Sequence, residues 1–302
     1  MAQQYPSRPI RYIAPNLPGG PTDILARTLG QKLSESMGQP IIVENRAGGS
    51  GIIGTEAAAK SPPDGYTLVS GNNGTFGANA SLFRKLPYDP VRDFLPVVLL
   101  VAQPNILVVH PSLPVKSVKE LVAFAKARPG QLSYAGTGIG AAANMSAELF
   151  KNMTGANMVG ISYKSAAPAL TELVAGQTQL MFATALSVTP NIRSGRLRAL
   201  GVTTAKRMAA MPELPTIAEA GVPGFETSTW HGVLVPAGTP APVVEKLNAE
   251  FNRALRLPDV RERLTALGAE ILGGTPKELA DHIQREILKW GKIVKSLGVR
   301  AD

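Results

Sequence analysis

The sequence of 302 residues contains no cysteine, and this absence excludes disulfides, zinc–thiolate centres, iron–sulfur clusters and a cysteine nucleophile. Histidine is also scarce, because His110, His231 and His282 are the three in the chain and they are far apart in sequence. The sequence has no serine-hydrolase elbow, P-loop or paired-histidine zinc helix. We therefore predict no catalytic residue, no metal site and no cofactor.

Aromatic residues are few, at 5% of the chain, although basic residues outnumber acidic ones by 31 to 22 and give a formal net charge of +9. A basic chain attracts anions. Its lysines and arginines are scattered, however, and it offers few rings on which bases could stack. We therefore expect an acidic small molecule as partner, and no nucleic acid.

Long hydrophobic runs are missing as well. The longest apolar stretch, Phe94–Val109, is interrupted by Pro96 and by Gln103-Pro104-Asn105, and it falls short of the roughly 20 residues of a membrane span. No secretory signal is visible. The opening Met1-Ala2-Gln3-Gln4 resembles a new start placed before a mature N-terminus, and a cytoplasmic chain that begins at Met1 is the alternative.

Short apolar runs alternate with amphipathic stretches along the chain, as in the predicted strand Arg8–Ala14 and the predicted helix Thr22–Met37. Capping boxes begin at Ser117, Thr216 and Thr275, where a hydroxyl is followed three residues later by glutamate. Strands that alternate with helices predict an α/β fold with mostly parallel sheets flanked by helices.

At about 150 residues per domain, the length predicts two domains. Gln103-Pro104-Asn105 separates two apolar runs, and Trp230-His231 precedes a further apolar run, so both positions suit a chain that crosses between domains. We predict that lobe one spans residues 1–103 and 232–302, that lobe two spans residues 104–231, and that a hinge lies near residues 103 and 230.

Two glycine-rich segments each lie between a predicted strand and a predicted helix. We call Pro18–Asp23 the first glycine loop and Gly136–Ala141 the second glycine loop. Glycine allows close backbone approach, and a helix N-terminus offers unpaired amides and partial positive charge to a carboxylate or phosphate. One such loop in each half could hold a single anion. The alternative is a pair of ordinary turns.

The third glycine loop, Gly49–Gly54, has the literal Gly-x-Gly-x-x-Gly spacing of a dinucleotide fingerprint. That fingerprint also needs an acidic residue about 20 positions later, at the end of the next strand. The corresponding strand ends in Ser70-Gly71-Asn72, without an acid. A dinucleotide-dependent enzyme therefore stays only as an alternative.

Further segments, in order along nearly the whole chain, match the motifs of one family. They are Gly19–Asp23 with Ala26-Arg27, Val43–Gly48, Pro63–Leu68, Leu86–Pro90, Tyr163–Ala169, Leu214–Gly221 and Pro236–Pro240. With them the chain resembles the Bug family, the substrate-binding proteins of tripartite tricarboxylate transporters.

The resemblance implies a two-lobed, type II-like periplasmic binding protein with a cleft between the lobes. Such a protein captures a small organic acid (a carboxylate or dicarboxylate, or an aromatic acid) and delivers it to a membrane permease of the tripartite tricarboxylate type. The resemblance also implies a periplasmic location after removal of a signal peptide, and we expect a monomer. Some members act in signalling, so a ligand sensor for a receptor is the alternative.

The loops and the resemblance together assign ligand-binding residues. They are Asn16, Gly19, Gly20, Thr22, Asn73 and Thr75 in lobe one, and Thr137, Gly138, Asn144, Ala183 and Thr184 in lobe two. We expect one carboxylate to be held by the amides of Gly20 and Thr22 and by the Thr137 hydroxyl and Gly138 amide. Asn16 stands where the family commonly has an aromatic residue, and Ala183 where it often has aspartate. The second departure predicts a ligand without an ammonium group.

Overall fold

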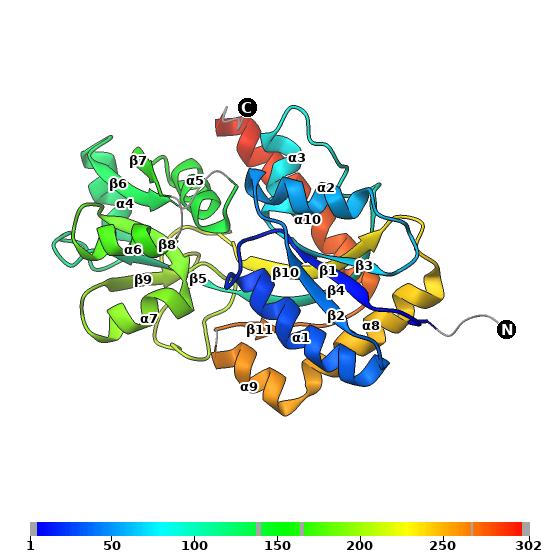
Figure 1. The fold of residues 1–302 in the computed structure, drawn as a ribbon. Coiled ribbons are helices and arrows are strands. Elements are labelled where there is room, and N and C mark those ends of the chain that lie inside the picture. The colour runs from blue at the N-terminus through cyan, green and yellow to red at the C-terminus, as the bar shows by residue number, and fades with distance from the viewer. Residues whose placement is uncertain (1–4, 137–139, 164–165, 267, 298–302) are drawn as a thin grey trace. The chain divides into compact units, whose positions relative to one another are not determined.

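The computed structural model describes residues 5–136, 140–163, 166–266 and 268–297. The chain forms two compact units (Figure 1). Unit 1 comprises the described residues up to Ala102 together with Trp230–Lys295, and unit 2 comprises Gln103–Thr229 with the last two described residues, Ser296 and Leu297. Unit 2 is therefore an insertion within unit 1, and we call Trp230, where the chain re-enters unit 1, the return crossing.

Unit 1 is built on a six-stranded sheet with the order β11-β4-β10-β3-β1-β2. Its elements are β1 (Ile10–Ala14), α1 (Pro21–Met37), β2 (Ile41–Asn45), the short turn η1 (Gly49–Gly51), α2 (Ile52–Ala59), β3 (Thr67–Asn72), the π-helical turn η2 (Gly74–Ala78), α3 (Asn79–Leu82), β4 (Phe94–Gln103), β10 (Thr229–Pro236), α8 (Ala241–Arg256), α9 (Pro258–Ala266), β11 (Glu270–Ile271) and α10 (Pro276–Leu297). Strand β1 runs parallel to β2 and β3, so these three strands end at the same edge of the sheet.

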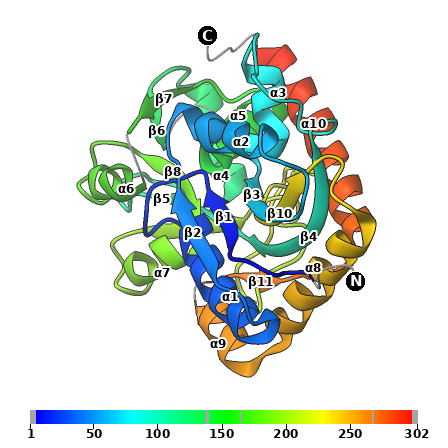
Figure 2. The ribbon, with the colours of Figure 1, turned by 45° about the vertical axis from the view of Figure 1, so that its right-hand side comes forward.

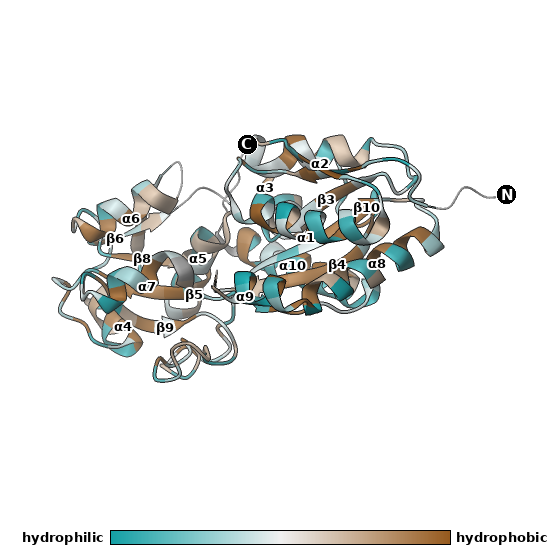
Figure 3. Cartoon of the chain, turned by 60° about the horizontal axis from the view of Figure 1, so that its bottom comes forward, coloured by the Kyte–Doolittle hydropathy of each residue, from teal (hydrophilic) through white to brown (hydrophobic). Residues whose placement is uncertain are grey.

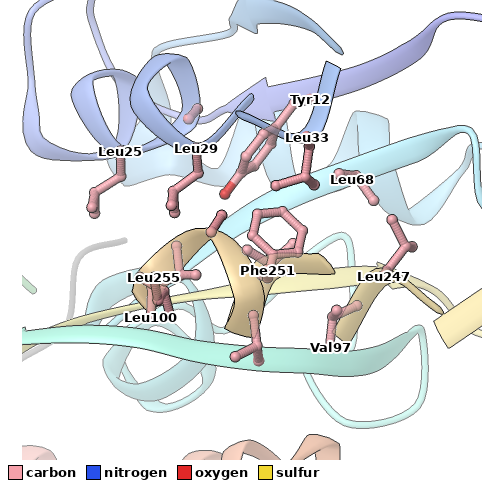
Figure 4. Packing of buried hydrophobic residues seen from close by; sticks show 14 of the residues in the cluster. Tyr12, Leu25, Leu29, Leu33, Leu68, Val97, Leu100, Leu247, Phe251 and Leu255 are labelled. Carbon is pink, nitrogen blue, oxygen red and sulfur yellow. The ribbon is translucent and has the colours of Figure 1, made fainter. Parts of the chain in front are cut away.

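Side chains alternate between the two faces of the sheet along each strand of unit 1. Helices cover both faces, so both sets of side chains are buried. Tyr12 of β1 points to the face covered by α1, α8 and α9, which lie next to one another (Figure 2). There its ring meets that of Phe251 edge-on at 6.2 Å between centroids (Figure 4). Ile13 points to the other face, which α2 and α10 cover together with the side chain of Trp230.

Unit 2 has a five-stranded sheet with the order β7-β6-β8-β5-β9. Its elements are β5 (Asn105–Val109), α4 (Val118–Ala127), β6 (Leu132–Gly136), α5 (Ala142–Thr154), β7 (Met158–Ser162), α6 (Ala166–Val174), β8 (Leu180–Thr184), α7 (Ala185–Arg193) and β9 (Arg198–Val202). One apolar cluster joins the sheet to α6 and α7. The rings of Phe150, Phe182 and Phe225 form a second contact, from α5 to β8. The hydropathy colours of Figure 3 show apolar strands between helices that also carry polar residues.

The α/β class is confirmed, but the sheets are mixed rather than mostly parallel. Strand β6 is parallel to β7 and β8, as the alternation of strands and helices predicts. Strands β5 and β10, which follow the crossings between units, are antiparallel to their neighbours. Strand β5 is antiparallel to β8 and β9, and β10 is antiparallel to β3. Alternation predicts only the strands that helices connect within one unit.

Two of the three capping boxes begin helices, at Ser117 before α4 and at Thr275 before α10. The box at Thr216 also forms, since the amides of Thr216 and Glu219 each donate to the other's side chain. Only a turn follows it, because Gly221 is left-handed and Pro223 lies two residues further on. Among the described residues, none of the helices combines the length and the apolar character that a membrane crossing requires.

Candidate ligand-binding site

The first glycine loop connects β1 to α1 and is held in shape by its own aspartate. Gly19 is left-handed at φ +79°, and its amide donates to Asp23 Oδ2 at 2.9 Å. The Gly20 amide makes a long hydrogen bond of 3.3 Å to the Leu17 carbonyl. The Thr22 amide lies in the first turn of α1, where N–H groups lack an acceptor within the helix. Of the two amides predicted to bind ligand, the one on Thr22 is therefore the more available.

Asn16 and Thr22 form one hydrogen-bonded group with the end of β2. Thr22 is 1% exposed, and its hydroxyl donates to Asn16 Oδ1 at 3.2 Å. Asn45 Nδ2 donates to the Asn16 carbonyl at 3.3 Å, and Arg27 Nη2 donates to Asn45 Oδ1 at 3.1 Å. Asn16 is thus held by one hydrogen bond from α1 and one from the end of β2.

The charges at this helix N-terminus are already paired. Burial raises the pKa of Asp23, but the hydrogen bonds from Arg27 and from the Gly19 amide outweigh it and bring that pKa below its usual value. Asp23 is therefore ionised, and Arg27 Nε lies 2.9 Å from its Oδ1. An incoming anion would meet a neutral ion pair together with the partial positive charge of the α1 N-terminus.

The loop that follows β3 is an Asx turn closed by Asn72. Its Oδ1 accepts hydrogen bonds from the amides of Gly74 at 2.9 Å and Thr75 at 3.1 Å. The Thr75 hydroxyl accepts in turn from the Asn72 amide at 3.2 Å, and the Tyr88 hydroxyl donates to the Thr75 carbonyl at 2.7 Å. These contacts hold Thr75 in a buried position.

Asn73, which we predicted to bind ligand, makes hydrogen bonds within the protein from both ends of its amide. Nδ2 donates to Glu286 Oε2 at 3.0 Å, and Oδ1 accepts from the Trp230 amide at 2.9 Å. The residue is 3% exposed. In this structure it links the β3 loop to β10 and α10, and a contact of Asn73 with ligand stays a prediction.

The third glycine loop packs against its two neighbours, and this packing accounts for its glycines. A Cβ on Gly51 would lie 2.6 Å from Thr75 Cγ2, and one on Gly54 would lie 2.7 Å from the Arg46 carbonyl and 3.0 Å from Pro15 Cα. The residues Gly49, Ser50 and Gly51 are left-handed at φ +53°, +56° and +85°. The fingerprint spacing is thus explained by close contact between the loops after β1, β2 and β3.

In unit 2, Thr137 and Gly138 lie outside the described residues. Gly136, which ends β6, lies against the predicted residue Asn144 in the first turn of α5, because a Cβ there would clash with Asn144 Oδ1. The Thr184 hydroxyl, at the end of β8, donates to Ser187 Oγ at 3.1 Å.

Ala183 lies in the apolar cluster between the sheet of unit 2 and α6 and α7, and it is 3% exposed. The position where the family often has aspartate is therefore occupied by a methyl group in the core. Contact of Ala183 with ligand stays a prediction, and here its side chain touches other apolar residues.

The sequence analysis did not predict a buried polar cluster around Asn105, which begins β5 and lies beside Thr184 at the end of β8. Asn105 pairs with Thr184 across the sheet, and its amide donates to Thr203 Oγ1 at 3.1 Å. Ser146 Oγ lies 2.7 Å from Thr227 Oγ1, and the Thr227 amide donates to the Thr203 carbonyl at 2.8 Å. Asn105 Oδ1 is buried without a partner in the described parts of the chain. The only signal in the sequence was a polar residue within an apolar run.

The predicted residues fall on equivalent edges of the two sheets. In unit 1 they follow β1 and β3, and in unit 2 the described ones lie at the end of β8, which is a parallel neighbour of β6, and in the helix after β6, where Asn144 lies. Both are carboxyl edges of neighbouring parallel strands, where open α/β sheets bind their ligands. Two α/β units joined by crossings, each with such an edge, define a bilobed binding protein.

Comparisons with known proteins identify the family. Residues 25–299 match the family described as Tripartite tricarboxylate transporter family receptor. Protein BugT of Bordetella pertussis is 39% identical over 300 residues, which cover 99% of this chain and 92% of BugT. The chain belongs to this receptor family, and the resemblance to Bug proteins predicted from the sequence is confirmed.

Solved structures agree with this assignment. R. palustris Rpa4515 with adipate has a TM-score of 0.87 and 40% identity, with 98% of this chain and 99% of that chain covered. MatC (Rpa3494) from Rhodopseudomonas palustris with bound malate has a TM-score of 0.84 and 36% identity, with 96% and 100% covered. These relatives are solute-binding receptors and not enzymes, so the alternative of a dinucleotide-dependent enzyme is wrong.

Proposed function

We propose that the chain is a periplasmic receptor that captures a small organic acid and delivers it to the membrane permease of a tripartite tricarboxylate-type transporter. Membership of the receptor family supports this role, and the acids bound to two relatives, adipate and malate, are both small dicarboxylates. The observation that carries the proposal for this chain is the first glycine loop, which leads from β1 at the carboxyl edge of the sheet into the first turn of α1.

In this proposal one carboxylate of the acid accepts hydrogen bonds from the first turn of α1, chiefly from the Thr22 amide. The hydroxyl of Thr137 and the amide of Gly138 supply the contacts from unit 2, and bending near Gln103 and Trp230 brings them to the acid. Excluding water strengthens such charge-assisted hydrogen bonds. The acid is bound and released without chemical change.

The preferred ligand is an acid without an ammonium group. An ammonium group needs an anionic partner, and Ala183 supplies none where the family often has aspartate. The carboxylate of Asp23 is engaged by Arg27 and by the Gly19 amide. A plain dicarboxylate, or an aromatic acid that contacts apolar residues, therefore suits this chain better than an amino acid.

Titration calorimetry and thermal unfolding with adipate, malate, aspartate and glutamate test the proposal. An acid present at about 100 times its Kd should stabilise the folded protein by about 2.7 kcal/mol. Thr137→Val should abolish the shift, whereas Thr171→Val on the exposed face of α6, where the hydroxyl donates to its own helix, should leave it unchanged. Binding of aspartate or glutamate without binding of adipate or malate would contradict the ligand class.

Delivery to a permease is tested separately by measuring acid uptake in a strain that lacks the gene. Restoration of uptake by the wild-type chain, but not by a variant that fails to bind acid, is the expected result. Unchanged uptake together with lost acid-dependent gene expression would favour the sensor alternative.

A further inference from the structure

A buried carboxylate lies in α10 of unit 1, far in sequence from every predicted ligand-binding residue. Glu286 is 7% exposed, and its Oε2 accepts three hydrogen bonds from neutral donors. The donors are Trp290 Nε1 at 2.8 Å, Asn73 Nδ2 at 3.0 Å and Trp230 Nε1 at 3.2 Å. Its Oε1 lies 3.5 Å from Lys289 Nζ. A buried carboxylate is costly unless such partners compensate it, so this arrangement is closely specified.

The three donors come from three separate segments of unit 1. Asn73 belongs to the loop after β3, Trp230 is the return crossing, and Trp290 lies in α10 itself. Asn73 Oδ1 also accepts from the Trp230 amide at 2.9 Å, so Asn73, Trp230 and Glu286 form a closed triangle of hydrogen bonds. The ring of His282, also in α10, packs edge-on against Trp230 at 4.9 Å between centroids.

Two features of the proposed receptor meet at this triangle. Asn73 lies inside the turn that Asn72 closes onto Gly74 and Thr75, and that turn belongs to the candidate site. Trp230 lies where unit 1 resumes after unit 2, at the predicted hinge. We propose that Glu286 is a positioning residue that fixes the loop Asn72–Thr75 to the return crossing, and thereby sets the affinity of unit 1 for acid.

The negative charge of Glu286 is central to this role. A carboxylate has only acceptor sites, so it can receive all three N–H groups, and hydrogen bonds to a charged acceptor are about twice as strong as those between neutral groups. Glutamine keeps the shape but is neutral and brings two N–H donors of its own. The substitution Glu286→Gln should therefore loosen the triangle while the apolar contacts of α10 remain.

Hydrogen exchange of the protein without ligand tests the positional part of the proposal. In Glu286→Gln the amides of Gly74, Thr75 and Trp230 should exchange about tenfold faster, while those of β1 and β2 keep their wild-type rates. Asp281→Asn is the matched control, because it removes one negative charge from the exposed side of the same helix, where Asp281 pairs with Lys277. Unchanged exchange at the three amides, or an equal increase throughout the sheet of unit 1, would overturn the proposal.

Tryptophan emission gives a second readout, because the two tryptophans of the chain are Trp230 and Trp290 and both donate to Glu286. The emission maximum should shift in Glu286→Gln and not in Asp281→Asn. If Glu286→Gln fails to fold, Asn73→Ser removes the two sides of the triangle that the Asn73 amide makes and leaves both indole hydrogen bonds in place. The same three amides should then exchange faster, and wild-type exchange rates in this variant would contradict the role.

The statement about affinity rests on the proposed function and is tested by titration with adipate and malate. Glu286→Gln should weaken binding by about tenfold, and Asp281→Asn should leave it unchanged. A faster-exchanging loop with wild-type affinity would overturn the link to binding. If the wild-type protein binds no acid, the proposed function fails, and the exchange rates still decide whether Glu286 positions the loop.

Discussion

Two of the residues predicted to bind ligand in unit 1, Asn16 and Asn73, are held by hydrogen bonds from distant parts of the chain, whereas Thr184 in unit 2 bonds to a near neighbour. Asn73 is bonded to Glu286, 213 residues away, and Asn16 to Asn45. Thr184 in unit 2 is bonded to Ser187, three residues away. A site whose residues are already fixed loses less conformational entropy when it binds. If these residues bind the acid as proposed, unit 1 provides the preorganised part of the proposed binding site.

The largest expected effect tests whether each unit has its own core. Phe251→Ala removes a ring that packs against Tyr12 in unit 1, and it should lower the free energy of unfolding by about 3–5 kcal/mol. Denaturant unfolding measures this loss, and Phe251→Leu should cost less. Hydrogen exchange should show loss of protection in β1 and β3 while β6 and β8 stay protected. Equal loss in both units would show that they are not separate in stability.

The next prediction concerns the dependence of folding stability on pH, which we expect to arise mainly in unit 1. Burial lowers the pKa of His231 from 6.5 to about 4, and neither ring nitrogen has a partner within the described ranges of the chain. Between those pH values the unfolded chain binds the proton and the folded one does not. Stability should therefore fall as pH falls from 6.5 to 4, by about 3 kcal/mol in total.

His231→Leu should remove most of this dependence without loss of stability at pH 7.5. His282, whose pKa is lowered mainly by burial against the opposing influence of Glu286, should supply the remainder. Unfolding curves at pH 7.5, 6, 5 and 4 measure the slope. If His231→Leu kept the wild-type dependence of stability on pH, groups other than His231 would be responsible for the loss of stability at low pH.

Alanine substitutions at one glycine in each unit compare the packing of their loops. In unit 1, Gly54→Ala brings a methyl against backbone atoms of Arg46 and Pro15 and should cost about 2 kcal/mol. In unit 2, Gly136→Ala meets the end of the Asn144 side chain, which can turn away, so the cost should stay below about 0.5 kcal/mol. Thermal unfolding measures both, and equal costs would remove the contrast between the two units.

The last comparison concerns the hydroxyl pair of unit 2. Ser146→Ala leaves the Thr227 hydroxyl without its side-chain partner and should cost about 1 kcal/mol. Thr227→Val should cost less in the Ser146→Ala variant than in the wild-type protein, because the two hydroxyls are hydrogen-bonded to each other. A double-mutant cycle measures the coupling. Strict additivity would show that the 2.7 Å contact contributes nothing.

The sequence predicts those parts of the fold and site that local signals specify. A strand, glycines and a helix start in succession identify the first glycine loop, and the spacing of apolar residues identifies α1. The antiparallel course of β5 and β10 has no local signal, since it depends on pairing across the sheet. Glu286 escapes prediction for the same reason, because a charged residue in an amphipathic helix is typical of a solvated face.

The third glycine loop is the opposite case, because its dinucleotide-like spacing is a local signal for a function that the chain does not have. Its glycines are needed because Gly51 and Gly54 approach Thr75, Arg46 and Pro15 closely. The glycine spacing indicates that these positions have no room for a side chain. It does not indicate whether a cofactor or another loop of the same chain approaches the backbone there.

A crystal structure of the protein with adipate or malate tests the central claim most directly. We predict that one carboxylate of the acid lies against the first turn of α1, within hydrogen-bond distance of the Thr22 amide, and that it also contacts the second glycine loop. An acid bound away from both glycine loops would contradict the account.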